Sequence, residues 1–371
     1  MKLELETISP VKIGTGEVQE IDRFNSAIIG YKLIVLNTKK IFREILDYKD
    51  IKSRLGKESI QELVPDEILN DEDYWKYSVP IQDPDTKEIF KRNNEVDPHI
   101  LLPNNLVYLP GSSLKGALRT RLLYQYYVNN PSDWWYSRGN IERNPEKHFR
   151  LGQDNPKRDI LKTIRVTDSN GIKPSKAGLI VPIRTSTIER GGYFNLKPWK
   201  ELHFTIAPNK NFEFKIEVEE EKLRKMEDRW GNGDVKEMLG GYSEQDVLER
   251  LFEASNKMTI DRIERDLELF SSMKNKKELS KVIDSLEKIK ESLNQAKTDF
   301  CIINIGFGVG RLGTTIQLAA KDKDVRKQLR GNYGRNWQRD LNRYFPKTRK
   351  LYTGSEEPMG ELGWVKLERL K

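Results

Sequence analysis

The stretch Leu109-Pro-Gly-Ser-Ser-Leu-Lys-Gly-Ala-Leu-Arg-Thr120 defines one element of the fold more clearly than any other part of this 371-residue chain. The residues 110–113 are typical of a turn, and a serine among them can act as the N-cap of a helix that follows. Leu114, Leu118 and Leu122 recur at intervals of four residues. This spacing predicts a helix to about residue 128 with the three leucines on its buried face.

A second face of the same helix carries Ser112, Lys115 and Arg119. A helix N-terminus presents unpaired N–H groups and partial positive charge, so a hydroxyl and two cations beside it predict a phosphate-binding site. Gly116 would let another backbone approach closely, at a cost to helix stability of about 1 kcal/mol relative to alanine. The alternative is an ordinary capped core helix with a solvated basic edge. The coincidence of Gly111 and Gly116 with the basic pair favours the phosphate site.

A glycine-rich stretch, Asn304-Ile-Gly-Phe-Gly-Val-Gly-Arg-Leu-Gly-Thr-Thr315, follows a predicted buried strand. Its last three glycines match the G-x-G-x-x-G pattern of dinucleotide-binding folds, but the polar run 321–327 stands where that fold requires an acidic residue after a second strand. Thr314 and Thr315 replace the Lys-Ser/Thr pair of a P-loop. Four glycines with Arg311 among them still predict a backbone surface that lies along phosphates. The alternative is a tight strand-to-helix turn.

Basic residues are concentrated near the end of the sequence. Lys and Arg number 65 against 57 Asp and Glu, a net charge of +8. Residues 321–350 alone hold eleven basic and three acidic residues, which is the same +8. Aromatic residues interleave with these charges, namely Tyr333, Trp337, Tyr344 and Phe345. The pattern suits a phosphate backbone with bases to stack on, and it suits equally a solvated basic helix with aromatic residues in the core.

Composition excludes several classes of protein. Apolar residues make up 36% and charged residues 33% of the chain, with a mean hydropathy of −0.71. No apolar run approaches the roughly 18 residues that a bilayer crossing needs, and the first ten residues contain no signal-peptide core. A single cysteine, Cys301, excludes an internal disulfide framework and a cysteine-rich zinc site. We therefore expect a soluble, cytoplasmic protein with no membrane contact, no cofactor and no metal.

Candidates for catalysis are few. His99, His148 and His203 are isolated in the sequence, and none has a second ligand or a nucleophile at a useful spacing. Ordinary surface or packed roles are therefore the better prediction for all three, with His203 on a strand among apolar neighbours. No carboxylate cluster of the D-x-D kind indicates bound magnesium.

The remaining pattern predicts an α+β protein. Strands are predicted at 3–7, 27–36, 106–109, 160–167, 179–187, 201–207, 212–218, 300–305 and 364–370. Helices are predicted at 38–48, 59–69, 112–128 and 314–320, and an antiparallel helix pair at 243–297 with a polar break at 271–277. Four prolines among Asp and Asn predict an irregular insertion over 70–105.

Several of these motifs together resemble a known family. The opening stretch Leu5-Glu-Thr-Ile-Ser-Pro-Val-Lys-Ile-Gly-Thr-Gly-Glu17 is similar to the first strand and loop of the RAMP superfamily of CRISPR RNA-binding proteins. Leu109–Thr120 resembles its P-G-S-S-x-K-G-x-x-R helix, and Gly306–Gly313 its C-terminal glycine-rich loop. The ending Phe345–Arg349, followed by Leu362–Leu367, is most similar to the cap subunit of type III-A (Csm) effector complexes.

The resemblance implies two ferredoxin-like (RRM-like) domains with helical and loop insertions. The first would span 1–195, with an insertion near 58–105, and the second 196–371, with the helical pair 243–297 and the glycine-rich loop 306–313. It also implies a structural subunit, not an enzyme, that binds guide (CRISPR) RNA, caps the filament near the crRNA 3′ end and supports crRNA maturation. The implied partners are crRNA and other Csm-type RAMP backbone subunits, with target RNA and a host trimming nuclease as further candidates.

The motifs assign fifteen candidate RNA-binding residues. They are Lys12, Gly14, Gly16, Gly111, Ser112, Ser113, Lys115, Arg119, Gly306, Gly308, Gly310, Arg311, Gly313, Lys347 and Arg349. The main alternative function is a metal-independent endoribonuclease of the same superfamily that processes precursor crRNA, with His99 or His148 as its candidate acid or base. A nicotinamide-dependent enzyme is a third hypothesis and rests only on the glycine pattern.

Overall fold

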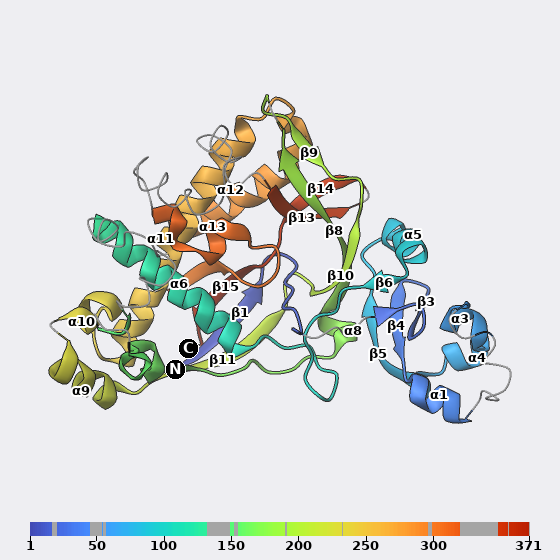
Figure 1. The fold of residues 1–371 in the computed structure, drawn as a ribbon, viewed down its shortest axis with the longest axis horizontal. Coiled ribbons are helices and arrows are strands. Elements are labelled where there is room, and N and C mark those ends of the chain that lie inside the picture. Colours follow the sequence, from blue (N-terminus) through green and yellow to red (C-terminus); the bar gives the residue numbers. More distant parts are fainter. Residues whose placement is uncertain are drawn as a thin grey trace.

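The computed structural model describes residues 1–16, 21–44, 54, 57–131, 149–151, 155–189, 191–231, 233–295, 299–319, 348–354 and 356–370. Within these ranges the fold is mixed α/β, with two large sheets, a layer of helices and a small lobe at one end (Figure 1). Every pairing between the named strands is antiparallel. The parallel sheet of a dinucleotide-binding fold is therefore not formed by the described strands.

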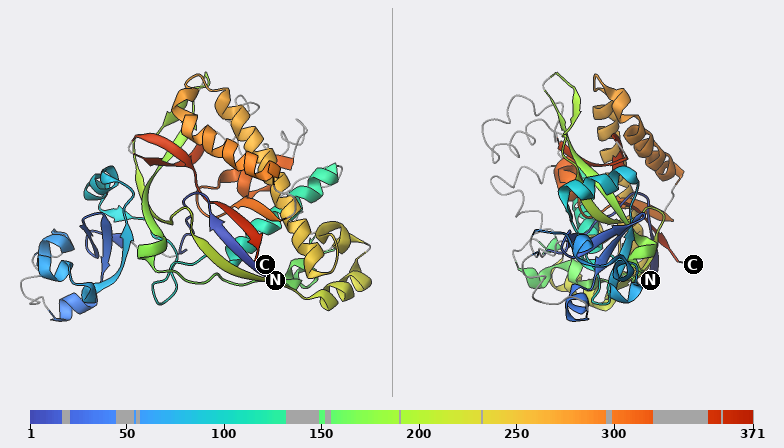
Figure 2. Two further views of the ribbon diagram at one scale, coloured as in Figure 1. Left: turned by 180° about the vertical axis from the view of Figure 1, so that it is seen from behind. Right: turned by 90° about the vertical axis from the view of Figure 1, so that its right-hand side faces the viewer.

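The first large sheet has the strand order β12-β15-β1-β11-β7. These strands are β12 (Phe300–Asn304), β15 (Trp364–Arg369), β1 (Lys2–Thr7), β11 (Asn211–Val218) and β7 (Ile164–Val166). In β1 the residues Leu3, Leu5 and Thr7 are buried and alternate with more exposed side chains, as the sequence predicts. Leu3 pairs with Arg369, so the first and last described strands lie side by side and the two ends of the chain are close in both views of Figure 2.

The second large sheet has the order β10-β8-β13-β14, and the short strand β9 pairs with the far end of β8. The bounds are β10 (Glu201–Ile206), β8 (Gly178–Ile188), β13 (Thr348–Gly354), β14 (Glu357–Glu361) and β9 (Phe194–Leu196). Strands from both sides of residue 195 pair within each large sheet, so both sheets cross the boundary that the sequence analysis places there.

The principal helices are α6 (Gly111–Asn129), α11 (Glu244–Ser271) and α12 (Ser280–Gln295). Figure 1 shows α6 crossing in front of the first sheet, and α11 packs against α6 and β12. The predicted helix pair is confirmed, since α11 and α12 pack together and a single 3-10 turn, η5 (Lys276–Leu279), joins them. Ser243 and Asp246 form a capping box at the start of α11, which explains where that helix begins.

A small lobe contains β3 (Ser26–Ile29), β4 (Lys32–Leu36) and β5 (Trp75–Pro80), covered by α1 (Thr38–Glu44), α3 (Ile60–Leu63) and α4 (Asp66–Leu69). The prediction of one strand over 27–36 is wrong. Gly30 has φ +58°, in the left-handed region, and the chain reverses there to pair β3 with β4. An apolar run of this length cannot distinguish one buried strand from a hairpin whose two strands are both buried.

The prediction of an irregular insertion over 70–105 is also wrong in part. This region contains the 3-10 turn η1 (Glu72–Tyr74), β5, the ten-residue helix α5 (Pro84–Asn93) and the short strand β6 (Glu95–Val96), which pairs with β2 (Ile21–Asp22). Asp83 accepts a hydrogen bond from the Thr86 N–H at 2.8 Å and caps α5, and Pro84 stands at its first position. Pro84, which looks like a break in the sequence, is here the start signal of a helix.

Three shorter predictions also differ from the structure. The strand predicted at 160–167 begins as a 3-10 turn, η4 (Ile160–Thr163), because Asp159 caps the Leu161 N–H. The run 106–109 makes only isolated bridges through Val107. The helix predicted at 314–320 is replaced by the short helix α13 (Gly310–Thr314) and the 3-10 turn η6 (Ile316–Ala319).

The remaining described helices are α8 (Pro174–Ala177), the 3-10 turn η3 (Pro156–Arg158), α9 (Glu220–Trp230) and α10 (Asp234–Leu239). Among the residues that the structure describes, no helix is both long and apolar enough to span a membrane.

Candidate nucleic-acid interface

The N-terminus of α6 is occupied by the protein itself. The helix begins at Gly111, with Pro110 as the N-cap residue, so the predicted serine cap is wrong. The Gly111 N–H donates to Asp168 Oδ1 at 2.8 Å, and this carboxylate stands where the sequence analysis places a phosphate. A Cβ at Gly111 would lie 2.3 Å from the Thr167 carbonyl oxygen. Glycine is therefore required here by the close approach of the strand end and not by a ligand.

The two cations of α6 contact the protein. The Lys115 Nζ donates to the Ile164 carbonyl oxygen at 2.7 Å, and burial lowers the pKa of Lys115. The Arg119 guanidinium lies 3.5 Å from the Asp159 carboxylate and over the ring of Phe149, 5.1 Å from its centroid. Both side chains therefore connect the helix to Phe149, Asp159 and Ile164, so the solvated basic edge that was the alternative to a phosphate site is in fact a set of tertiary contacts.

What α6 leaves open is a flank of small residues. Ser112 and Gly116 are exposed, and a Cβ at Gly116 would meet no atom within 4 Å. The Thr120 hydroxyl, one turn further on, donates to the Gly116 carbonyl oxygen at 3.2 Å. A glycine inside a helix costs about 1 kcal/mol relative to alanine. No contact within the described chain accounts for that cost.

The glycine-rich loop lies against the first loop of the chain. The Phe307 N–H donates to the Lys12 carbonyl oxygen at 2.8 Å, and the Ile305 N–H donates to the Gly363 carbonyl oxygen at 2.8 Å. Gly363 in turn donates to the Pro10 carbonyl oxygen at 2.9 Å. Backbone hydrogen bonds thus join three segments that are far apart in sequence, the third being Gly363. We call the surface formed by residues 10–16 and 305–314 the glycine-loop surface.

The four glycines of this loop have different surroundings. Gly306, Gly308 and Gly310 have φ values of +80°, +82° and +71°. A Cβ at Gly306 would lie 2.2 Å from the Lys12 carbonyl oxygen, whereas a Cβ at Gly310, which is exposed, would meet nothing within 4 Å. Gly313 is buried. Gly306 and Gly310 are both exposed at conformations that favour glycine, but of the two only Gly310 leaves the Cβ direction open.

The other predicted RNA-binding residues near this surface differ in their exposure. Gly14 and Gly16 are exposed, directly after the buried Ile13 that contacts the glycine loop. Ser113 is half-buried. The Arg311 Nε donates to Gln317 Oε1 at 2.6 Å.

Lys12 is buried within a cluster of charged and aromatic side chains. Its Nζ pairs with Asp97, lies 3.1 Å from His203 Nδ1 and lies 4.8 Å from the centroid of the Phe307 ring. The His203 ring stacks on Phe307 with centroids 4.8 Å apart. Lys350 donates to Glu201 Oε2 at 2.8 Å on the other side of the cluster. Lys12 is 2% exposed, so it holds the glycine loop in place instead of projecting toward a ligand.

His203 has the packed role on a strand that the sequence predicts, because it lies buried in β10 between the buried Leu202 and Phe204. The sequence analysis missed its acidic partners, since Asp97 and Glu201 lie 3.2 Å and 3.4 Å from its two ring nitrogens. Glu201, two residues away on the same face of β10, is a signal in the sequence that could have indicated a polar site.

Asp97 and Glu201 make the stability of this cluster dependent on pH. Contacts with His203 and Lys12 lower the pKa of Asp97 to about 2, and contacts with His203 and Lys350 lower the pKa of Glu201 to about 2. Both carboxyls ionise more readily in the folded chain than in the unfolded one. Their contribution to the free energy of unfolding is therefore complete above about pH 5 and is lost as the pH falls toward about 2.

We expect the double variant Asp97→Asn/Glu201→Gln to be less stable than the wild type at neutral pH and to approach it only near about pH 2. Urea unfolding at a series of pH values measures this difference. Glu221→Gln removes a solvated carboxylate of α9 and is the control. It should change the free energy of unfolding at neither neutral nor acid pH. A stability difference that stays constant from neutral to acid pH would contradict the assignment.

His99 is a buried structural histidine. Its Nδ1 accepts a hydrogen bond from the Ile13 N–H at 3.1 Å, and its Nε2 lies 3.1 Å from the Tyr108 carbonyl oxygen and so carries the proton. Burial lowers the pKa of His99 to about 4. The side chain positions the first loop beside the glycine loop and cannot reach a scissile RNA group. His148, the other candidate of the endoribonuclease hypothesis, lies outside the described residues.

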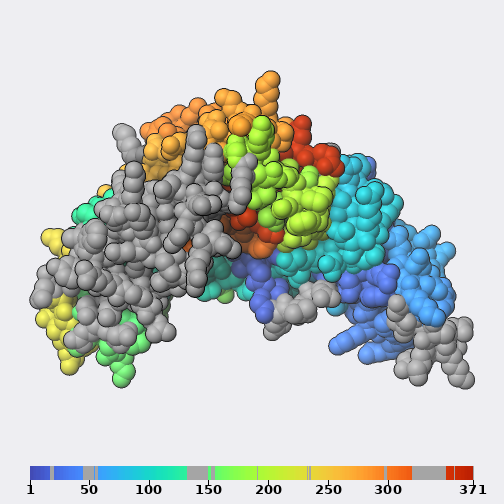
Figure 3. All heavy atoms as spheres, turned by 45° about the horizontal axis from the view of Figure 1, so that its top comes forward, coloured from blue at the N-terminus to red at the C-terminus, as the bar shows by residue number. Residues whose placement is uncertain are grey.

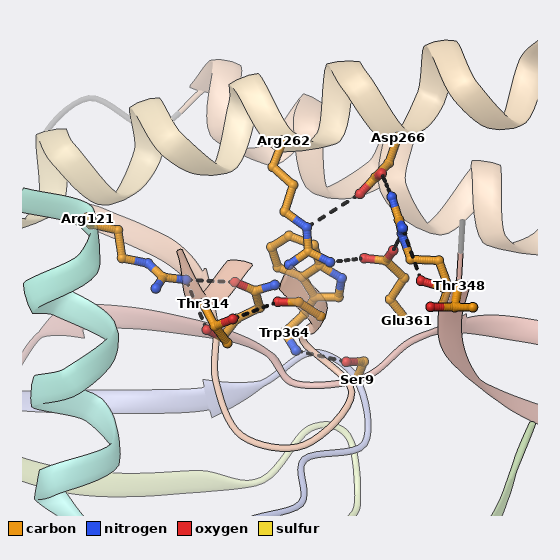
Figure 4. Close-up of polar contacts among 11 residues, drawn as sticks. Ser9, Arg121, Arg262, Asp266, Thr314, Thr348, Glu361 and Trp364 are labelled. Carbon is orange, nitrogen blue, oxygen red and sulfur yellow. Dashed lines mark hydrogen bonds and ion pairs between the residues drawn. The ribbon is translucent and has the colours of Figure 1, made fainter. Parts of the chain in front are cut away.

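Arg349 belongs to a buried ion-pair cluster, drawn in Figure 4. It donates to Asp266 Oδ1 at 2.6 Å, and Arg262 donates to Glu361 Oε2 at 2.8 Å while its Nε lies 3.4 Å from Asp266 Oδ2. Arg262 also lies over the Trp364 ring, 4.9 Å from its centroid. The guanidinium of Arg349 is therefore occupied inside the protein, contrary to the predicted RNA contact. Lys347 and the basic stretch 321–347 lie outside the described residues.

Burial alone would raise the pKa of Asp266, but the two guanidiniums hold it below its usual value, whereas burial raises the pKa of Glu361.

A second buried arginine, Arg121 of α6, lies beneath the glycine-loop surface. It donates to the Asn304 carbonyl oxygen and to Asn304 Oδ1 at 2.9 and 2.7 Å, and more weakly to the Gly313 carbonyl oxygen at 3.5 Å (Figure 4). No carboxylate is among its hydrogen-bond partners in the described chain. Sequence analysis missed this residue, although an arginine between Leu118 and Leu122 on a core-facing stripe indicates a buried polar contact.

The described residues contain no group of three or more His, Cys, Asp or Glu side chains that could hold a metal ion. The model of the RAMP superfamily matches residues 4–313, a range that includes the first loop, α6 and the whole glycine-rich loop. The chain belongs to the RAMP superfamily.

Individual RAMP proteins are similar to this chain over nearly its full length. It is 25% identical to the CRISPR system Cms protein Csm5 of Methanocaldococcus jannaschii over 399 aligned positions, which cover 99% of this chain and 88% of that protein. A chain in a cryo-EM structure of a type III-A Csm–crRNA–target RNA ternary complex superposes with a TM-score of 0.66 at 22% identity, covering 99% of this chain and all of the other. The crystal structure of T. onnurineus Csm5 has the same TM-score at 21% identity, with 98% and 99% coverage.

Proposed function

We propose that this RAMP protein binds guide CRISPR RNA as a structural subunit of a type III-A effector complex. In this role it caps the filament near the crRNA 3′ end and supports crRNA maturation. The likeness to Csm5 proteins over nearly the full length of both chains supports the proposal. So does the likeness to a chain within a complex that contains crRNA and target RNA. The partners are then crRNA, target RNA, the other Csm-type subunits and a trimming nuclease, in the cytoplasm.

One observation of the structure carries the RNA-binding part of the proposal. The exposed backbone at Gly310 lies on the short helix α13, whose Gly313 carbonyl contacts the buried guanidinium of Arg121. Because the hydrogen-bond partners of Arg121 among the described residues are all neutral, its charge makes the overlying surface electropositive. Open backbone over a buried cation suits a phosphate chain that approaches closely, and the exposed Gly116 of α6 is a second stretch of open backbone.

The sheet topology supports the ferredoxin-like part of the proposal. The neighbours β15-β1-β11-β7 are antiparallel throughout, and α6 connects β1 to β7. Numbered in chain order, the four strands have the arrangement 4-1-3-2 of a βαββαβ sheet, with β12 added at the edge. We assign this sheet to one ferredoxin-like unit and the second large sheet to the other, with segments 1–195 and 196–371 contributing strands to both.

The proposal assigns the chain no catalytic step. Its rival, a metal-independent endoribonuclease, requires a histidine at the scissile 2′-hydroxyl. His99 is fully enclosed and hydrogen-bonded at both ring nitrogens, so it does not supply that group.

Substitutions at Gly116 test the RNA surface, because stability and binding should change in opposite directions. Gly116→Ala and Gly116→Glu should each stabilise the fold by up to about 1 kcal/mol, since both residues favour a helix more than glycine does and no atom obstructs them. Gly116→Glu should weaken guide RNA binding about fivefold, because two like charges 4 Å apart in water repel by about 1 kcal/mol. Fluorescence anisotropy with labelled guide RNA, together with thermal melts, measures both quantities.

Gly116→Lys is the control of equal bulk. It should bind at least as tightly as Gly116→Ala and steepen the dependence of log K on log salt by about 0.7 for single-stranded RNA. The RNA should stay intact with Mg²⁺ and with EDTA in all variants. Equal affinities for the Glu and Lys variants would remove this flank from the interface, and specific cleavage by the wild type would restore the enzyme hypothesis.

A further inference from the structure

Two large aromatic side chains are exposed on one hairpin that the proposed RNA surface does not include. Tyr193 is 48% and Trp199 is 55% exposed. They flank β9, the strand that pairs with the far end of β8, and Figure 3 shows the light-green hairpin at the surface beside the turn between α11 and α12. Most other large aromatic residues of the described chain are buried or half-buried, so this pair requires an explanation.

The two rings stand on either side of β9 along the chain. Phe194 is buried in the core beneath β9, whereas its neighbours Tyr193 and Asn195 are exposed, as the alternation of a strand requires. Lys197 follows the end of β9, and its Nζ lies 5.8 Å from the centroid of the Trp199 ring. From residue 193 to residue 199 the backbone spans at most about 20 Å.

The hairpin is held rigidly by the turn after α11. The Asn275 side chain accepts a hydrogen bond from the Phe194 N–H and donates to the Phe194 carbonyl oxygen, both at 2.8 Å. The Lys274 N–H donates to the Gly192 carbonyl oxygen at 2.9 Å. The outward backbone groups of Phe194 are therefore already satisfied, which removes the polar edge that a strand from another protein would need at this point.

Cations surround both rings. The Lys274 Nζ lies 4.9 Å from the centroid of the Tyr193 ring, and the exposed Lys276 and Lys277 follow directly on the same turn. Five lysines of the hairpin and the turn, at positions 197, 200, 274, 276 and 277, outnumber the three glutamates near them, at positions 189, 278 and 356. Lysine is depleted in the cores of protein–protein interfaces, whereas exposed aromatic rings among cations suit unpaired bases and their phosphates.

We propose that Tyr193 and Trp199, with Lys197 and Lys274, form a stacking platform for unpaired bases of single-stranded RNA. The inference rests on the proposed function and adds a second contact area, on the second large sheet. Stacking reads no particular base, because every base has a π-face, so the platform would accept different guide sequences. A duplex offers no free base faces to it.

Trp199→Ala should weaken the binding of a labelled oligouridine to the full chain about tenfold. Trp199→Phe should keep most of the affinity, since it retains a ring. Because no charge is removed, the salt dependence should stay that of the wild type, whereas Lys274→Ala should flatten the slope of log K against log salt by about 0.7. Affinity for an RNA duplex of equal length should not change in Trp199→Ala.

Tyr31→Ala is the matched control, because Tyr31 is 62% exposed at the turn between β3 and β4 in the small lobe. It should leave oligouridine affinity unchanged. Wild-type affinity in folded Trp199→Ala, while the chain still binds RNA, would overturn the platform and leave the proposed function standing. Loss of co-purifying Csm-type subunits without loss of RNA affinity would make the hairpin a protein contact and also overturn it. Failure of the wild type to bind any RNA would overturn both proposals.

Discussion

Asp266→Ala is expected to lower the free energy of unfolding by about 3–5 kcal/mol, the typical cost of removing one partner from a buried ion pair. Asp266 is 1% exposed and is the shared acceptor for Arg262 and Arg349. Its removal leaves two buried guanidiniums with Glu361 as the one remaining carboxylate of the cluster drawn in Figure 4. Denaturant unfolding followed by circular dichroism measures the loss.

Two control variants distinguish the loss of a buried charge from other causes of destabilisation. Asp284→Ala removes an exposed carboxylate from α12 and should change stability by less than about 0.5 kcal/mol. Arg349→Met replaces a buried cation by an apolar chain of similar length, and it should cost less than Asp266→Ala because Asp266 keeps Arg262 as its partner. A loss below about 1 kcal/mol in Asp266→Ala would show that the cluster is not closed to water.

Gly306→Ala is expected to destabilise the chain by about 2–4 kcal/mol, whereas Gly310→Ala should cost only about 1 kcal/mol. Both glycines have positive φ, so any side chain adds strain of about 1–2 kcal/mol. At Gly306 the new Cβ would also lie 2.2 Å from the Lys12 carbonyl oxygen, and a backbone atom cannot move away cheaply. At Gly310 nothing lies within 4 Å. Thermal and denaturant unfolding of the two variants test this order.

Among the variants that remain folded, a substitution at Gly310 should weaken RNA binding most, although it costs the least stability. Gly310→Val places a side chain on the open backbone and should weaken RNA retention more than Arg311→Ala, which removes one cation. Gly308→Val is less informative, because a Cβ there would meet the flexible Leu362 side chain at 2.8 Å and disturb packing within the protein. If Gly310→Val folds and binds RNA normally, the glycine at this position serves only the turn.

Several elements could be predicted because their signals are local. The leucines of α6 repeat at helical spacing and are buried, and β1 shows the alternation of a half-buried strand. The helix pair α11–α12 was likewise evident from its spacing and its polar break. The predictions were wrong where a local sequence pattern fits two different structures. Residues 27–36 form a hairpin because Gly30 reverses the chain, and 70–105 is ordered because Asp83 and Pro84 start a helix.

The sequence by itself determined the family, the principal helices and the first strand of this protein, since these depend on motifs and on spacings of two to four residues. The tertiary structure alone shows which basic residues are paired within the protein. Lys115 bonds to a carbonyl 49 residues away and Arg349 to a carboxylate 83 residues away. No spacing along the sequence predicts such partners. A lysine or arginine that is paired in the folded protein cannot be distinguished in the sequence from one that stays in water. The difference arises on folding, which removes water from the first side chain and leaves the second exposed.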